Sequence, residues 1–396
     1  MPATAYHPII IIGGGPAGLA TALHLKQQTP ELARDLVILE AKEYPRPKLC
    51  GGGITVHGEE QLAALGIKID VPAFRVDRLV FRLGSHEFVV PHEGAMRVIQ
   101  RAEFDAALAD AARQHQIRIL SGERLLDAHP IENGYQIETN KGIYHTRALI
   151  GADGSNSTVR RKLRFDSTEG VARLLRVLTP INPNDKLMHE RTAVFDFSCI
   201  KRGIRGYMWD FPCYVDGQPH MNSGIFDSRI TPKDTSQPHG NLKQTFADFL
   251  AQRGVDLEAV ELKGHPVRWF APSSEFSRPH VMLAGDAAGV DALFAEGISY
   301  AMEYGEIVAT MLQDAFARDD YSFSDYRERI MAHHMGKLLM RRALIARTIF
   351  PYHVPPFWSV FWRLAAVAPS WMQQEIGAWM ALLPAKDQTP LQAQFT

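Results

Sequence analysis

The sequence predicts a mixed α/β protein, α+β overall, with a helix-covered parallel sheet, an inserted antiparallel sheet and a helical C-terminal region. Three observations predict this fold class. A β-branched run at 9–12 leads into a glycine turn and an Ala/Leu-rich helical pattern. Residues 165–275 alternate short strand-like runs with Pro, Gly and Asn breaks, and a second strand, glycine turn and helix follow at 280–316. The parallel layer is therefore interrupted and resumes late in the chain.

Size and composition exclude several classes of protein. The 396 residues suffice for one large domain or two or three coupled layers, and 43 basic against 44 acidic residues give no sign of nucleic-acid binding. The three cysteines, at 50, 199 and 213, are too scattered for a disulfide framework or a zinc site. The sixteen histidines lack metal-ligand spacing. We expect a cytoplasmic protein with no metal and no nucleic-acid partner.

The first unit, residues 1–45, is predicted to form strand, helix and strand around a G-x-G-x-x-G turn. The first glycine allows the tight turn, the second lets the backbone approach a pyrophosphate, and the third lets the helix pack closely on the strand. The run LVILE then ends at Glu40, where a carboxylate can accept hydrogen bonds from an adenosine ribose. This unit predicts a dinucleotide site made of Gly13, Gly15, Pro16, Ala17, Gly18, Glu40 and Ala41.

Later segments complete the same layer. RAEFDAALADAARQHQ predicts a helix before the strand IRIL, and GYQIETNKGIYHTRALIGADG predicts a hairpin that turns near 140–142. EGISYAMEYGEIVATMLQDAF predicts a long helix. We predict a discontinuous dinucleotide-binding domain at 1–165 and 276–330, an antiparallel-sheet substrate domain at 166–275 with part of 70–100, and a helical C-terminal region at 331–396.

Two further segments, GADGSNSTVR and AGDAAG, follow the first turn along the chain. In this order the three resemble the flavoprotein monooxygenase superfamily typified by p-hydroxybenzoate hydroxylase. The resemblance implies a Rossmann-like domain that binds FAD, with the ADP half on the first turn and the ribityl chain on Asp286, beside amides of a helix N-terminus. It implies further cofactor-binding residues at Arg101, Asp153, Gly154, Gly285, Asp286, Gly289, Gly297 and Ile298.

Two other motifs, PRPKLCGGG at 45–53 and GYMWDFP at 206–212, narrow the family. Together they resemble the geranylgeranyl reductase family, whose members saturate isoprenoid double bonds. The resemblance implies cofactor contacts at Cys50, Gly51 and Gly52, and the glycines 51–53 would let the backbone lie against the flavin ring, where a side chain would collide. Tyr207 and Trp209, two apart on a strand, would face the same way and line an apolar tunnel. The candidate catalytic residues are Cys50, Tyr207 and Trp209.

The chain also departs from that family's pattern. VDALFAEGI stands where many members have a proline and small polar residues, so Asp291 and Phe294 are expected in a loop facing the flavin. Ile204 stands in place of a proline before the tyrosine. These differences indicate that the substrate differs from a geranylgeranyl lipid at this loop.

Several assignments remain open at this stage. Cys50 is either a functional thiol or a small buried residue, and a free thiol is a weak acid for protonating an alkene. Tyr207 and Trp209 are either tunnel walls or ordinary core. Arg46 and Lys48 are either solvated charges or ligands of an anionic head group such as a diphosphate.

The predicted activity is FAD-dependent reduction of an apolar unsaturated chain, with NADPH or reduced ferredoxin as electron donor. The rival on the same fold is an oxygen-using hydroxylase or halogenase. A halogenase needs a catalytic lysine, for which Lys68 is the nearest candidate. The rival from another class is a membrane-associated flavoprotein that relays electrons to a partner, although the chain lacks an iron–sulfur cysteine cluster.

The tail at 351–384 is rich in apolar residues but broken by charged residues and prolines. It contains four tryptophans and follows three arginines, which favours a peripheral contact with the inner membrane face. The alternative is that these helices cover the core or form a dimer contact. The residues concerned are Arg341, Arg342, Arg347, Trp358, Trp362, Trp371 and Trp379.

Overall fold

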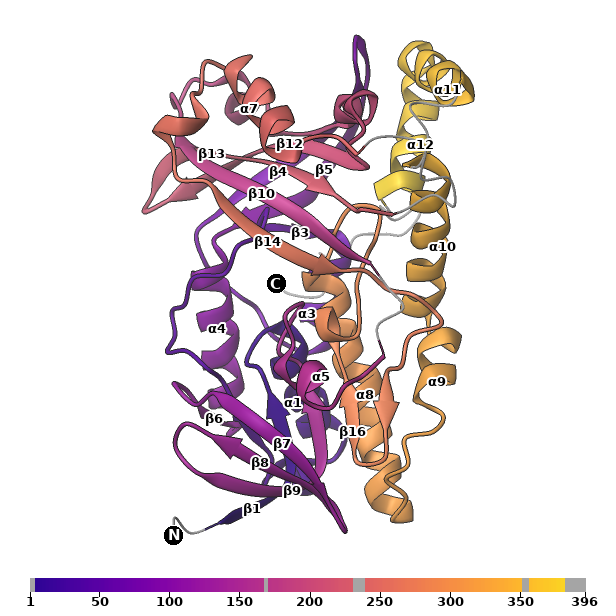
Figure 1. The fold of residues 1–396 in the computed structure, drawn as a ribbon. Helices are drawn as coiled ribbons and strands as arrows, with labels where there is room; N and C mark the ends of the chain where they lie inside the picture. The colour runs from indigo at the N-terminus through magenta and orange to yellow at the C-terminus, as the bar shows by residue number, and fades with distance from the viewer. Residues whose placement is uncertain (1–3, 167–169, 231–238, 351–355, 382–396) are drawn as a thin grey trace.

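The structure is a computed structural model that describes residues 4–166, 170–230, 239–350 and 356–381. Two large β-sheets lie one above the other in Figure 1, and the C-terminal helices run along one side of both. This arrangement confirms the predicted fold class.

The first sheet has the spatial order β15-β16-β9-β1-β2-β6, and β8 joins β7 to its β9 side. Pairings of β1 with β2 and β9, of β2 with β6 and of β16 with β9 are parallel, as predicted for a buried layer. The hairpin β8–β9 is antiparallel. The strands are β1 (Ala5–Ile12), β2 (Val37–Leu39), β6 (Arg118–Leu120), β7 (Leu125–Ile131), β8 (Gly134–Thr139), β9 (Ile143–Gly151), β15 (Ser277–Arg278) and β16 (Val281–Leu283).

Helices α1 and α8 form the central pair beside this sheet. Gly305 permits their close crossing, because a Cβ there would lie 2.6 Å from Thr21 N. The helices of this part are α1 (Pro16–Gln28), α2 (Pro30–Ala33), α3 (Val56–Ala64), α4 (Arg101–Gln114), α5 (Thr158–Lys162), η3 (Gly285–Ala287) and α8 (Ile298–Arg318).

The second sheet has the order β14-β10-β13-β12-β11-β4-β5-β3, so it includes three strands from before residue 100. Most neighbours are antiparallel, whereas β11 runs parallel to β4. Its elements are β3 (Gly53–Thr55), β4 (Ala73–Leu83), β5 (His86–Ile99), β10 (Val171–Pro180), α6 (Lys186–His189), β11 (Thr192–Asp196), η1 (Phe197–Arg202), β12 (Gly206–Val215), β13 (Gln218–Asp227), α7 (Leu242–Ala251), η2 (Leu257–Ala259) and β14 (Lys263–Arg268).

The two faces of β12 have different partners because side chains alternate along a strand. Met208 packs in a cluster with Phe246 and Phe249 of α7. Tyr207 and Trp209 point to the opposite face and line a cavity. The position of α7 therefore leaves the aromatic face of the sheet turned toward the first domain.

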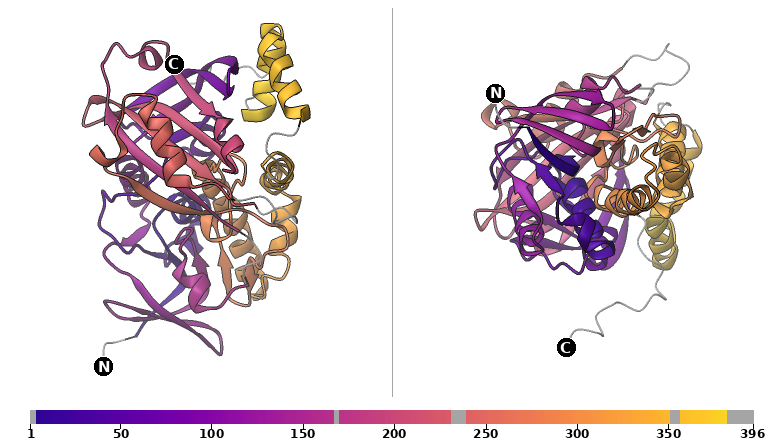
Figure 2. Two further views of the ribbon diagram at one scale, coloured as in Figure 1. Left: turned by 45° about the horizontal axis from the view of Figure 1, so that its top comes forward. Right: turned by 90° about the horizontal axis from the view of Figure 1, so that it is seen from below.

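The C-terminal region is helical, as predicted, and comprises α9 (Tyr326–Ala332), α10 (His334–Ile349), α11 (Pro356–Val367) and α12 (Ser370–Ala381). Both views of Figure 2 place α11 and α12 at one side of the molecule. Trp362 is 4 % exposed and packs against Phe88 and Phe197. Within the described ranges, the search for a helix both long and apolar enough to cross a bilayer found none.

Candidate active site

A continuous cavity of about 400 Å³ is lined by residues of both sheets. One part of its wall holds the first glycine turn, Glu40, Arg101, Asp153 and Asp286. Another part is aromatic. Its rings belong to Phe81, Phe195, Tyr207, Trp209, Phe211, Phe226 and Phe294.

The three glycines of the first turn serve different needs. A Cβ on Gly13 would lie 2.4 Å from Ala152 O, and one on Gly18 would lie 2.0 Å from Gly13 O, so the protein itself requires both glycines. Gly15 differs, because its Cβ would have only an Arg46 guanidinium nitrogen nearby, at 3.8 Å. The space beside Gly15 therefore belongs to the cavity, at the N-terminus of α1.

A buried charge network surrounds this turn. Glu40 accepts hydrogen bonds from Gly14 N at 2.9 Å and from a second backbone amide at 3.0 Å. Arg46 lies 3.3 Å from Glu40 Oε1 and 3.1 Å from Asp105 Oδ2. Arg101 donates to both oxygens of Asp105, at 2.7 and 2.9 Å. Both guanidinium groups are thereby held at the cavity wall.

Lys48 extends the positive lining. Its Nζ lies 2.8 Å from His265 Nε2, and both residues line the cavity with Asp286. Burial lowers the pKa of Lys48, against the opposing effect of Asp286. Burial and Lys48 lower the pKa of His265 to about 4, so the imidazole is neutral and can accept from Lys48 Nζ. Ser155 donates to Asp286 Oδ2 at 3.0 Å.

Asp153 lies between the cavity and α5. Its Oδ2 accepts from Thr158 N at 2.6 Å and from Val159 N at 3.1 Å, which satisfies amides of the first turn of the helix. Its buried Oδ1 has no hydrogen-bond partner among the residues that the structure describes. Burial raises the pKa of this carboxyl.

The loop containing Cys50 is held by the second sheet. Asn222 on β13 donates to Gly51 O at 3.0 Å and to Cys50 O at 3.3 Å, and its Oδ1 accepts from Trp209 Nε1 at 3.1 Å. Cys50 lines the cavity and is partly exposed. A Cβ on Gly51 would lie 3.3 Å from Phe211. The loop therefore packs against the aromatic wall.

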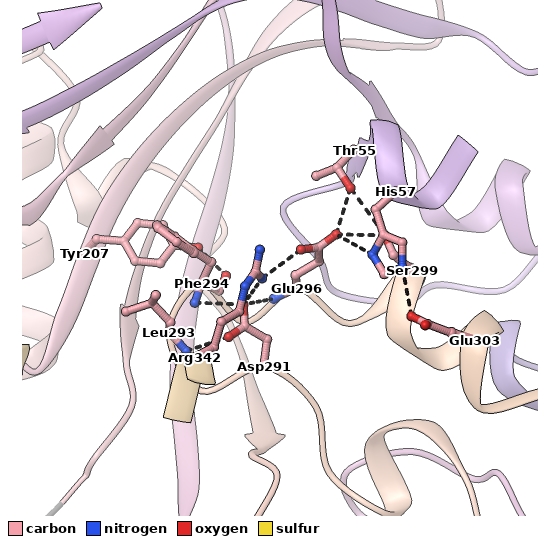
Figure 3. Close-up of polar contacts among 10 residues, drawn as sticks. All are labelled: Thr55, His57, Tyr207, Asp291, Leu293, Phe294, Glu296, Ser299, Glu303 and Arg342. Atoms are coloured by element: carbon pink, nitrogen blue, oxygen red, sulfur yellow. Dashed lines mark hydrogen bonds and ion pairs between the residues drawn. The ribbon is translucent and has the colours of Figure 1, made fainter. Parts of the chain in front are cut away.

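A second loop, residues 290–297, closes another side of the cavity. The Tyr207 hydroxyl donates to Phe294 O at 2.6 Å, and Phe294 lines the cavity as expected. Asp291, in the same loop, does not line the cavity, because its carboxylate turns back to accept from Leu293 N and Phe294 N. Arg342 of α10 binds Asp291 at 2.5 Å (Figure 3).

Arg342 Nη1 also binds Glu296 Oε2 at 2.8 Å, so one nitrogen bridges two buried carboxylates. Glu296 Oε1 accepts from Thr55 at 2.7 Å and from Ser299 at 2.9 Å (Figure 3). Burial opposes ionisation of Glu296, but Arg342 and His57 hold its pKa well below the usual range. Glu296 and Arg342 both line the cavity.

Most of the predicted site residues lie together on this cavity, and their predicted roles remain predictions. The exceptions are three glycines next to it: Gly18, which lets α1 pack closely against the first turn, and Gly285 (φ +58°) and Gly289 (φ +118°), whose backbone is left-handed. The residues that line the cavity are Gly13, Gly15, Pro16, Ala17, Glu40, Ala41, Cys50, Gly51, Gly52, Arg101, Asp153, Gly154, Tyr207, Trp209, Asp286, Gly297 and Ile298.

Three side chains differ from expectation. Arg46 is not a solvated charge, because it is buried between two carboxylates. Arg342 is 3 % exposed and ion-paired, so it cannot belong to a basic membrane-facing patch. Lys68 is exposed and does not line the cavity, which removes the proposed halogenase lysine. The side chains of Trp358 and Trp379 lie outside the described residues.

Several residues of the site carry no motif that marks them as part of it. Asn222 reaches the site because it pairs with Phe211 across β12 and β13. This register is visible only once the two strands are paired. His265 and Arg342 reach the cavity from β14 and α10. His57 and Glu296 meet through the packing of α3 against α8.

The chemistry of this wall fits FAD. The open space at Gly15, the α1 N-terminus and the guanidinium of Arg101 suit a pyrophosphate. The unpartnered Asp153 Oδ1 and the partly exposed Asp286 are acceptors suited to hydroxyl groups. Within the described residues, no cluster of histidine, cysteine and acidic groups suits a metal ion.

Comparisons with known proteins agree with this fit. The model of a family described as FAD binding domain matches residues 6–292. Digeranylgeranylglycerophospholipid reductase 2 of Methanopyrus kandleri is 27 % identical over 332 residues, which is 80 % of this chain and 79 % of the relative.

Solved structures share the fold. A geranylgeranyl bacteriochlorophyll reductase-like protein from Thermoplasma acidophilum superposes with a TM-score of 0.70 and 20 % identity, over 96 % of this chain and all of that one. A p-nitrophenol 4-monooxygenase from Pseudomonas putida gives a TM-score of 0.66 and 16 % identity, over 96 % and 99 %. The fold alone therefore does not separate reduction from oxygen chemistry. The chain belongs to the FAD binding domain family, and it is an FAD-dependent oxidoreductase that resembles geranylgeranyl reductases within that family.

Proposed function

We propose that this enzyme reduces carbon–carbon double bonds of an isoprenoid or similarly apolar, unsaturated chain. The observation that carries the proposal is the continuity of the cavity from Gly15 and Asp286 to the aromatic wall. A ligand held by the aromatic wall would share one enclosed space with the cofactor. The name of the Methanopyrus relative, a reductase of an isoprenoid lipid, supports the same substrate class.

When bound and reduced, FAD supplies a hydride, and the remaining requirements fall to the chain's own residues. The aromatic wall would exclude water and hold the alkene at near-attack distance, roughly 3 to 3.5 Å from the donor atom. Asn222 fixes the backbone of Cys50 and Gly51 beside this wall. The thiol of Cys50 lines the same space and is our candidate for the proton donor to the alkene.

An anaerobic single-turnover experiment tests this function. The FAD-loaded protein is reduced with dithionite, a geranylgeranyl lipid or geranylgeranyl diphosphate is added, and flavin absorbance is followed together with product mass. We expect the oxidised-flavin spectrum to return and the lipid to gain hydrogen pairs. Flavin that stays reduced with each prenyl substrate until oxygen is admitted contradicts the proposal.

The oxygen-using alternative makes a different prediction for the same sample. Admission of oxygen would then yield a hydroxylated or halogenated product. A halogenase also needs a lysine between cofactor and substrate, and the lysines that line the cavity in the described structure are Lys42 and Lys48. Lys48 is hydrogen-bonded to His265 beside Asp286, in the part of the cavity that we assign to FAD. This placement favours the reductase.

We also propose NADPH or reduced ferredoxin as the external electron donor. Mixing the anaerobic FAD-loaded protein with each donor and recording the loss of flavin absorbance distinguishes the two. The electron-carrier alternative predicts something else, namely that a partner protein reoxidises the flavin without any small-molecule product.

We further propose that α11 and α12 contact a membrane surface peripherally. Val360, Leu364 and Val367 lie on one face of α11, because they are spaced by four and three residues, and they are 53 to 80 % exposed. Trp371 on α12 is 61 % exposed, and the nearby Arg363 is exposed as well. Apolar and basic side chains together suit an anionic lipid surface.

Vesicle flotation tests this contact. The wild type should float with anionic vesicles, and Leu364→Ser combined with Val367→Ser should weaken binding. Flotation of the double variant equal to that of the wild type would remove α11 from the contact.

A further inference from the structure

Four titratable side chains form a line from the protein surface to the cavity, and its last step, from His57 to Glu296, is an ion-pair contact rather than a hydrogen bond. His333 Nδ1 lies 3.3 Å from Glu303 Oε1, and Glu303 Oε2 lies 2.8 Å from His57 Nε2. His57 Nδ1 lies 3.8 Å from Glu296 Oε1 (Figure 3). The line joins the start of α10 to the loop before α8 by way of α3.

The two ends of this line lie in different environments. The His333 side chain is 29 % exposed, whereas those of Glu303 and His57 are 4 % and 14 % exposed. Glu296, at the inner end, lines the cavity. A proton that enters at His333 would therefore cross a buried segment before it reaches the cavity.

Each group in the line can receive a proton on one side and release it on the other. An imidazole has two ring nitrogens and a carboxylate has two oxygens, and Glu303 uses a different oxygen toward each histidine. His333 Nδ1 also lies 3.2 Å from Met335 N. Neutral His333 accepts from that amide, and protonated His333 donates to Glu303.

We propose that His333, Glu303, His57 and Glu296 form a proton pathway that supplies the cavity from solvent. The inference rests on the proposed function, because saturating an alkene consumes protons. Glu303 and the two histidines are positioning and transfer groups rather than catalytic residues, since the chemistry takes place inside the cavity.

The proton balance of one turnover shows what the pathway must supply. Reduced ferredoxin would supply electrons alone, so reduction of bound FAD would take one proton from the pathway, whereas NADPH would bring that hydrogen itself as a hydride. The π bond of the alkene then breaks as one carbon takes the hydride with its electron pair. The other carbon takes a proton from the donor group in the cavity, and the pathway restores that proton. Each turnover would therefore draw two protons from solvent through His333 with ferredoxin as the donor, and one with NADPH.

His57 is the group that stores the proton. It faces Glu296 from the loop, and Glu303 and the ring of Tyr300 from α8, while Arg342 of α10 faces Glu296. Burial disfavours its charged form, but the two carboxylates outweigh burial and raise the pKa of His57 to about 9. Burial likewise opposes ionisation of Glu303, yet His333 and His57 lower its pKa to about 2.

Proton uptake during flavin reduction tests the pathway without any alkene. Anaerobic reduction of the FAD-loaded protein with reduced methyl viologen, a one-electron donor that releases no proton, in dilute buffer with an indicator dye reports the proton that reduction requires whichever substrate is later reduced. We expect Glu303→Gln and His333→Ala to slow proton uptake by at least about tenfold. Added imidazole should restore the rate in His333→Ala, because that site is open to solvent.

His129→Ala is the matched control. His129 is 52 % exposed and lies near Asp127 and Glu138 on the β7–β8 hairpin, so it has similar partners outside the pathway. It should neither slow uptake nor respond to imidazole. Unchanged uptake in both pathway variants with FAD still bound would overturn the proposal, while leaving the alkene assay free to succeed.

A second measurement does not depend on activity. In an NMR pH titration of labelled histidines, His57 should remain protonated at neutral pH and lose its proton near pH 9. A neutral His57 at pH 7 would contradict its role as the stored proton even if the variants failed to fold.

Discussion

In the turn motif, Gly15 is expected to serve the ligand rather than the fold, unlike Gly13. Gly13 has φ +108° and no room for a Cβ, whereas Gly15 has an extended backbone and open space beside it. We predict that Gly15→Val leaves the melting temperature of the FAD-free protein nearly unchanged but weakens FAD binding by about 2 kcal/mol, roughly thirtyfold. Gly13→Ala should instead destabilise the fold itself. Calorimetry of FAD binding and thermal unfolding of the apoprotein measure the two effects.

Asp286 allows a second test of FAD binding, at the proposed ribityl site. Asp286→Ala should weaken FAD retention during gel filtration, because it removes an acceptor from the cavity wall. Ser155→Ala, which removes only the partner of Asp286, is the control. Full retention by the alanine variant at 286 would remove the ribityl role.

Cys50 is partly exposed and lines the cavity, whereas the other two cysteines are buried. Cys213 is buried on β12, and burial raises its pKa to about 11. We predict that Cys50→Ala lowers single-turnover alkene reduction by about a hundredfold while FAD stays bound, as expected for loss of a proton donor. Cys213→Ala should keep its rate. Equal rates for the wild type and Cys50→Ala would exclude the thiol from the mechanism.

Among the elements, α10 stabilises the 290–297 loop through Arg342. Arg342→Gln leaves the buried Asp291 and Glu296 without their cation, which should cost about 3–5 kcal/mol of unfolding free energy. Since one nitrogen makes both contacts, Arg342→Lys should retain more stability than the glutamine variant. Arg347→Gln, on the exposed side of the same helix, is the matched control. Denaturant unfolding measures all three, and equal loss in the variants at 342 and 347 would contradict the assignment.

The pH dependence of stability is a property of the whole molecule. His57 has a raised pKa, so its contribution is complete below about pH 6.5 and disappears as the pH rises through about 9. Glu303 has a lowered pKa, so its contribution is complete above about pH 4.5 and disappears toward pH 2. The stability difference between wild type and His57→Gln should therefore fall by on the order of 3 kcal/mol between pH 6.5 and 9. A difference that is constant over this range would show that His57 is neutral.

Local patterns in the sequence predicted the elements whose structure depends on near neighbours. The first glycine turn, the helix after it and the β8–β9 hairpin follow from hydrophobic period and glycine placement, and all three are present. The motifs, together with the family resemblance that they carry, identified many of the residues on the cavity wall, including Glu40, Cys50 and Asp286. These motifs carry a signal because each needs a particular backbone shape within a few residues.

The tertiary structure alone decided which distant groups meet. The Arg342 side chain has the sequence context of a surface residue, yet it lies between Asp291 and Glu296 because α10 packs beside the 290–297 loop. Likewise His57 and His333 are joined through Glu303 only by the packing of separate helices. Long-range contacts set burial and charge pairing, and neither property leaves a periodic signal in the chain. The sequence by itself determined the FAD scaffold and its motifs, whereas the packing of distant elements determined the charge network beside the cavity.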